Sequence, residues 1–111
     1  MTDLLVVYVT APDETVATHI ARTLVEEELA ACVNVVPGVR SIYRWQGAVT
    51  EDAEILLVVK TRAERLAALT ARVVAIHPYT LPEVLALPVA DGHVPYLEWV
   101  RAGSGGAGLP S

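Results

Sequence analysis

The chain has 111 residues and a net charge of −5, and 53% of its residues are hydrophobic while only 19% are charged. This length predicts one domain with one core, and eight basic residues are too few for a phosphate-binding surface, so we expect no nucleic-acid partner. No apolar run approaches the roughly 20 residues needed to cross a bilayer, and the first residues lack the basic start of a signal peptide. We therefore expect a cytoplasmic protein with no membrane partner.

The composition also favours self-association. The charged share lies below the roughly 25% of an ordinary domain, which leaves few polar side chains to cover an isolated monomer. There is no Phe, so the core must be aliphatic. Tyr and Trp are enriched where one surface buries against another, so these residues indicate interfaces. A monomer with a robust aliphatic core is the alternative.

The first half of the chain predicts a strand, a helix and a second strand. Residues 4–9 form a continuous valine-rich run, which is typical of a central strand covered on both faces. Residues 13–29 place apolar side chains on one face, which predicts an amphipathic helix. An extended segment follows over residues 32–36, is interrupted by Pro37-Gly38, and resumes over residues 39–45.

Alternation in this segment predicts a long hairpin arm. With a period of two, Tyr43 and Trp45 share one face, and Arg44 lies on the other. Gly47 opens a turn, and residues 54–61 supply a third strand. The extended segments are longer than a small sheet needs, so we expect their edges to pair with another chain.

The second half of the chain predicts a helix, an edge strand and a short terminal helix. Thr61 and Glu64 have the spacing of a capping box, so we expect the helix to begin there and to end before Pro78. Residues 82–89 form a strand bounded by prolines, and residues 95–101 form the terminal helix.

This order of elements predicts an α+β fold. Strand, helix, strand, strand, helix, strand is the ferredoxin-like βαββαβ arrangement, here with an extended β-hairpin and a C-terminal helix. We expect residues 1–102 to form this single domain and the Gly-rich residues 103–111 to form a flexible tail.

Four polar residues form the candidate ligand cleft. Lys60 lies at the end of the third strand, and His77, Tyr79 and Glu83 follow the second helix. A histidine before a proline at a helix end is more often structural than a ligand, because it can donate a hydrogen bond to the unpaired carbonyl groups at the end of the helix. Glu83 could pair with Lys60 or an arginine, could line a cleft between subunits, or could do both.

The candidate metal ligands, for copper or zinc, are His77 and Cys32. Thiolate suits a soft ion such as Cu(I), but Cys32 lies in an apolar stretch, which favours a buried, reduced thiol in the core. His19 and His93 have no partner at ligand spacing, so any metal site must be assembled from separate segments or chains. We expect no metal to be required for folding.

The aromatic residues are the candidate subunit contacts. They are Tyr43 and Trp45 with the neighbouring Arg44 on the arm, and Tyr96 and Trp99 near the C-terminus. Flat aromatic and guanidinium faces could instead stack a planar ligand, but the shared face of the arm favours packing between subunits.

Patterns for catalysis are weak. The chain has no Gly-x-Ser-x-Gly turn and no phosphate-binding glycine loop beside a strand. Ser41, His77 and Glu83 can be combined into a hydrolytic triad, but nothing in their spacing favours it, and Lys60 with His77 and Glu83 is the other enzyme hypothesis. We therefore expect no enzyme.

Six sequence blocks are informative together: TAPD at residues 10–13, LAACVN at 29–34, SIYRWQG at 41–47, LLVVKT at 56–61, HPYTLPE at 77–83 and YLEW at 96–99. These blocks resemble the CutA divalent-cation tolerance family. The resemblance spans nearly the whole chain, and the blocks occur in the right order and spacing. It implies a ferredoxin-like subunit in a tight homotrimer, similar to the PII signalling proteins, with linkage to copper and other divalent-metal tolerance and no known enzyme activity.

The resemblance also bears on metal binding. In some members copper binding is attributed to a cysteine at the end of the first strand and to two histidines before the Pro-Tyr motif. Here these positions hold Val9, Ile76 and His77, so one of these ligands is present. The leading hypothesis is a cytoplasmic homotrimer that binds a divalent metal ion or small ligand in clefts between subunits and acts in the response to metal ions. The alternatives are a trimeric scaffold without a ligand and a PII-like signalling protein that acts through a protein partner.

Overall fold

The computed structural model describes residues 2–105 of the chain, and these form a four-stranded antiparallel sheet with three α-helices. In chain order the elements are β1 (Leu4–Ala11), α1 (Glu14–Glu26), β2 (Cys32–Trp45), β3 (Ala48–Arg62), the 3₁₀ turn η1 (Ala63–Arg65), α2 (Leu66–Ile76), β4 (Leu85–Pro88) and α3 (Val94–Gly103). The predicted α+β fold with two helices, a long hairpin and a terminal helix is confirmed.

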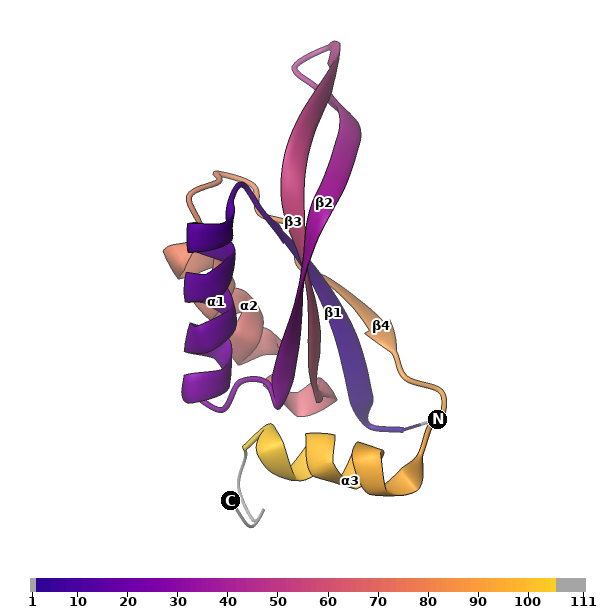
Figure 1. The fold of residues 1–111 in the computed structure, drawn as a ribbon. Helices are drawn as coiled ribbons and strands as arrows, with labels where there is room; N and C mark the ends of the chain where they lie inside the picture. The colour runs from indigo at the N-terminus through magenta and orange to yellow at the C-terminus, as the bar shows by residue number, and fades with distance from the viewer. Residues whose placement is uncertain (1, 106–111) are drawn as a thin grey trace.

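The sheet has the strand order β2-β3-β1-β4, so β1 is central, as predicted, and β2 and β4 are the edges. Figure 1 shows α1 and α2 together on one face of the sheet, while α3 lies across the end that is farthest from the hairpin tip. The core fills the space between the two helices and the sheet. It is aliphatic, as the absence of Phe requires, and includes Val7, Val9, Ile20, Leu24, Leu57, Val59, Leu69 and Val73.

The hairpin of β2 and β3 projects beyond the body of the subunit (Figure 1). A register shift between Val36 and Val39 marks the point where the arm departs, and Gly38 adopts φ 81° there. We call residues 39–54 the arm. Trp45 pairs with Ala48 across a two-residue turn in which Gln46 and Gly47 both have positive φ, so β3 begins at Ala48 rather than at the predicted residue 54.

The predicted capping box at Thr61 and Glu64 is wrong. The Thr61 hydroxyl is fully buried and donates instead to the carbonyl oxygen of Leu29 at 2.7 Å, while Glu64 forms an ion pair with Arg62. The chain passes through η1 before α2 begins at Leu66, and neither element has a side-chain cap. The Thr61 hydroxyl, at the end of a buried strand, therefore forms its hydrogen bond with a neighbouring segment and not with the helix that follows it.

The bounds of two other predicted elements, the first helix and the last strand, also need correction. Helix α1 begins next to Asp13, close to the predicted start, and the Asp13 side chain caps it. It ends at Glu26 rather than residue 29, because Glu28 takes the left-handed conformation with φ 57°. Strand β4 is shorter than predicted, at Leu85–Pro88.

The predicted flexible tail begins too early at residue 103. Gly103 is the last residue of α3, and Ser104 is buried and donates its hydroxyl to the carbonyl of Val100 at 2.6 Å. The remainder of the predicted tail, residues 106–111, lies outside the described residues. Within residues 2–105, no helix combines the length and the apolar character that a membrane span requires.

Candidate functional site

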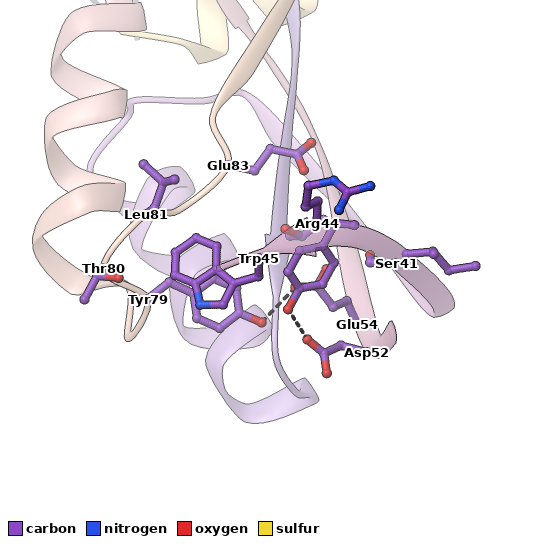
Figure 2. Close-up of a pocket in the computed structure, with 12 residues that line it drawn as sticks. Ser41, Arg44, Trp45, Asp52, Glu54, Tyr79, Thr80, Leu81 and Glu83 are labelled. Carbon is purple, nitrogen blue, oxygen red and sulfur yellow. Dashed lines mark hydrogen bonds between the residues drawn. The ribbon is translucent and has the colours of Figure 1, made fainter. Parts of the chain in front are cut away.

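A cavity of about 690 Å³ lies at the base of the arm, and we call it the arm cleft. One wall is the face of the arm that carries Tyr43, Trp45, Asp52 and Glu54, and the segment after α2 supplies Tyr79, Thr80, Leu81 and Glu83 (Figure 2). The volume falls in the range of small-molecule sites, about 300–1,000 Å³. Three aromatic rings and three carboxylates therefore meet in one hollow.

Glu54 is the most enclosed polar group of the arm cleft. Its residue is only 8% exposed, and it lies opposite Val39 where the arm joins the body. The Tyr79 hydroxyl donates to Glu54 Oε2 at 2.7 Å (Figure 2). Burial, and then this hydrogen bond to Glu54, raise the pKa of Tyr79, so the phenol stays protonated and remains a donor.

Among the described residues, Glu54 has no cationic partner. The ion pairs of the subunit lie elsewhere, and Tyr79 is the only side chain that donates a hydrogen bond to Glu54. A neutral phenol does not balance the charge of a buried carboxylate, and an uncompensated buried charge is costly. Glu54 is therefore a buried carboxylate without a counter-charge in the described part of the chain.

A second tyrosine and carboxylate pair lies further along the arm. The Tyr43 hydroxyl donates to Asp52 Oδ2 across the hairpin (Figure 2). This hydrogen bond to Asp52 is the main cause that raises the pKa of Tyr43. Asp52 and Glu54 are two residues apart on β3, so both side chains point to the same face of the arm.

Glu83 supplies the third carboxylate, from the segment before β4. Burial raises the pKa of Glu83, and the charge of Glu54 raises it further. The cleft therefore places negative charges close enough to oppose one another. Within residues 2–105, however, no three Asp, Glu, His or Cys side chains converge closely enough to hold a metal ion by themselves.

His77 lies behind the cleft rather than in it. It is 8% exposed, its Nε2 donates to the Thr10 carbonyl oxygen at 2.7 Å, and its Nδ1 accepts from the Tyr79 backbone N–H at 3.1 Å. The two rings lie 4.5 Å apart, centroid to centroid. His77 thus fixes the loop that carries Tyr79. This agrees with the structural role favoured from the sequence, although its partner is β1 rather than the end of its own helix.

Lys60 is not brought to the cleft. Its Nζ donates to the side-chain oxygen of Asn34 on the neighbouring strand, and Lys60 pairs with Cys32 and Val6 in the sheet. No ion pair joins Lys60 to Glu83, so of the alternatives left open for Glu83 the pairing with Lys60 does not occur. Of the four predicted cleft residues, Tyr79 and Glu83 line the cavity, His77 supports it and Lys60 lies apart.

Cys32 lies at the α3 end of the sheet. It is half-buried rather than buried as predicted, and its Sγ lies 3.6 Å from the Tyr96 hydroxyl. Tyr96 also stacks on Trp99, with ring centroids 5.7 Å apart, and both rings are exposed. Cys32 and His77 do not meet within one chain. Tyr96 and Trp99 remain available for contacts with another chain.

Sequence reasoning missed Asp52 and Glu54 as site residues. The alternation that placed Tyr43 and Trp45 on one face contained the necessary information. A two-residue turn at Gln46-Gly47 sets the register, which pairs Ser41 with Asp52 and Val39 with Glu54 on that same face. The sequence predicts a turn at Gly47 but not its length.

Residues 5–103 match the family described as CutA1 divalent ion tolerance protein. The chain belongs to this family. It is 58% identical over 100 residues to the divalent-cation tolerance protein CutA of Thermus thermophilus, a match that covers 90% of this chain and 97% of the relative. Human CutA is 52% identical over 94 residues, which cover 85% of this chain, and the chain spans about half of the human protein, 52%. The family takes its name from ion tolerance, not from an enzyme activity.

Solved CutA structures have the same fold. The structure of the Thermus thermophilus protein superposes with a TM-score of 0.90 at 57% identity, covering 92% of this chain and 99% of that one. CutA of Xylella fastidiosa gives a TM-score of 0.91 at 42% identity, covering 94% of this chain and all of that one, 100%. The names of relatives indicate several compartments, because the rice and Arabidopsis proteins are called chloroplastic and the Archaeoglobus fulgidus protein periplasmic.

Proposed function

We propose that this chain is a cytoplasmic, homotrimeric divalent-cation tolerance protein that binds a divalent metal ion or small ligand in clefts between subunits. The observation that carries the proposal is Glu54, a nearly buried carboxylate that faces the arm cleft without a cationic partner among the described residues. Family membership supplies the link to divalent-ion tolerance.

The shape of the subunit supports assembly. The arm extends past the helices and leaves large apolar side chains in water, among them Ile42, Trp45 and Val49. Both sheet edges, β2 and β4, have unpaired backbone groups within the described chain. Pairing an arm with an edge of the next subunit would satisfy both features, and three such contacts around an axis close a ring. Tyr43, Arg44, Trp45, Tyr96 and Trp99 remain the proposed contact residues.

The charges of the cleft support a cation as ligand. Glu54 and Glu83 oppose one another electrostatically, and Asp52 lines the same cavity, so a divalent ion would replace this repulsion by attraction. Carboxylate oxygens can bind zinc, and a subunit with too few convergent ligands can complete a site with groups from its neighbour. In this proposal the second subunit supplies the remaining ligands.

The copper positions of the family do not fit a metal here. Val9 is a fully buried apolar residue, Ile76 has no donor atom, and both nitrogens of His77 are already hydrogen-bonded. Cys32 remains the one thiol and lies at the other end of the sheet. We therefore place the proposed cation site at Glu54 and derive no role for His77 in holding it.

Titration calorimetry on the assembled protein, with Zn(II) and with Cu(II), tests this proposal. Glu54→Gln should abolish saturable binding, because it removes the buried charge and keeps the shape. Glu51→Gln is the matched control, since Glu51 lies on the outer face of the same strand, paired with Arg40. Wild-type protein that takes up neither ion, or equal uptake by Glu54→Gln, would count against the proposal. Light scattering on the same samples should give three times the chain mass of 11.9 kDa.

A scaffold or PII-like signalling role is the second candidate. Leu81 is 72% exposed at the rim of the cleft, and Val74 is exposed on α2, so apolar side chains also face solvent outside the arm. A protein partner that docks there would remain bound in the presence of a chelator, and the double change Val74→Ser, Leu81→Ser should release it. Loss of the partner on chelation would instead favour the cation site.

A further inference from the structure

The arm cleft holds two similar units, each made of a tyrosine and a carboxylate. Tyr79 donates to Glu54 and Tyr43 donates to Asp52, and Trp45 adds a third aromatic ring to the same cavity (Figure 2). Aromatic rings supply no ligand atoms for a single divalent metal ion. Aromatic faces beside carboxylates are, however, the surroundings in which an organic ammonium group is bound, because the ring and the anion both attract the cation.

The spacing of the two units is set by the strand. Asp52 and Glu54 are separated by one residue on β3, so their Cα atoms lie about 7 Å apart. A short aliphatic diamine carries two ammonium groups at a comparable separation, and its methylene chain would pack against the rings. The cavity of about 690 Å³ has room for such a molecule with water around it.

The local charge also favours a dication. Three carboxylates line the cleft, and Arg44 is the one basic side chain among the residues that line it. Figure 2 shows the Arg44 guanidinium directed away from Asp52, and Arg44 forms no ion pair with Asp52 or Glu54. Glu54, at 8% exposure, has the neutral Tyr79 as its one side-chain hydrogen-bond donor within residues 2–105. An ammonium group at Glu54 would supply the missing counter-charge and up to three hydrogen-bond donors.

We propose that the arm cleft also binds short aliphatic diamines, with one ammonium group at Glu54 and Tyr79 and the other at Asp52 and Tyr43. This inference rests on the cation cleft of the proposed function and extends it from metal ions to organic dications. Each head would then lie against one carboxylate and one ring. The length of the diamine becomes the basis of selectivity.

Calorimetry with 1,4-diaminobutane tests the inference, with 1-aminobutane and 1,4-butanediol as probes that have the same four-carbon chain and carry one charge or none. The diamine should bind at least about tenfold more tightly than the monoamine, since a second charge-assisted hydrogen bond contributes about 1.5–3 kcal/mol. Glu54→Gln should weaken diamine binding by about tenfold or more for the same reason. Glu51→Gln, on the outer face of the arm, should leave it unchanged. Asp52→Asn should reduce the preference for the diamine over the monoamine.

Equal affinity for the diamine, the monoamine and the diol would overturn the inference, and so would unchanged binding in Glu54→Gln. Far-ultraviolet circular dichroism of each variant shows whether the fold is kept, and Tyr79→Phe gives a second, milder change at the same unit. Uptake of Zn(II) or Cu(II) without uptake of the diamine would overturn this inference and leave the proposed function standing. Uptake of the diamine without uptake of either metal would support this inference and overturn the metal-binding part of the proposed function.

Discussion

Replacing His77 by alanine should destabilise the fold whether or not metal is present. The imidazole connects β1 to the loop after α2, through the Thr10 carbonyl at 2.7 Å and the Tyr79 N–H at 3.1 Å. Each hydrogen bond contributes about 1 kcal/mol, and a buried group left without its partner costs about 1–3 kcal/mol. Loss of the ring contact with Tyr79 adds about 0.5–1.5 kcal/mol. Allowing for partial rehydration of the freed groups, we expect His77→Ala to lose about 2–4 kcal/mol of unfolding free energy.

Guanidinium unfolding followed by circular dichroism, at one fixed protein concentration, measures this loss. The protein concentration is held constant because assembly would make the midpoint depend on it. The measurement is made with a chelator and repeated with added Cu(II). His19→Ala is the control, since His19 is exposed on α1 and its removal should change stability by less than about 0.5 kcal/mol. An unchanged midpoint in His77→Ala, or a loss that occurs only with copper present, would refute the structural role of this histidine.

Three further predictions follow from the cleft and the core. Glu83→Gln should raise stability at neutral pH. Burial and Glu54 raise the pKa of the folded carboxyl above its ordinary value of 4.5, which makes the ionised form unfavourable in the fold. The gain in stability should vanish below pH 4.5, and a gain that persists in acid would contradict this reasoning. Trp45→Ala should shift the mass in light scattering from trimer toward monomer, and a fully retained trimer would argue against the arm as a subunit contact. Leu57→Ala should cost about 2–5 kcal/mol in denaturant unfolding, because Leu57 is fully buried in the core, and a loss under about 1 kcal/mol would contradict that packing.

The order of elements could be predicted because each has its own periodicity. The valine run of β1, the one-sided apolar face of α1 and the alternation of β2 all depend on neighbours in the sequence, and they place the helices and strands correctly. Asp13 was expected near the start of α1, and it caps the helix with a side chain three residues from its partner, Val16.

The predictions that were wrong concern side chains whose partners lie far away in the sequence. Thr61 looks like a helix cap, but the fold brings the Leu29 carbonyl to its hydroxyl, 32 residues away. Lys60 was expected near Glu83, but the register between β2 and β3 brings its ammonium group to Asn34, to which it donates a hydrogen bond. Glu54 was overlooked because its importance depends on which arm face closes against the loop of Tyr79. Such contacts are decided by tertiary packing, which no local pattern contains.

A crystal structure of the protein grown with Zn(II), with anomalous scattering measured at the zinc edge, is the most direct test of the proposed cation site. We predict a peak in the arm cleft, within coordination distance of the Glu54 carboxylate (about 2.0–2.2 Å for zinc), with a second subunit completing the ligand set. Glu54→Gln crystals should lose that peak. A peak at His77 or Cys32 with none in the cleft, or a cleft closed entirely by packed side chains of the neighbouring subunit, would contradict it.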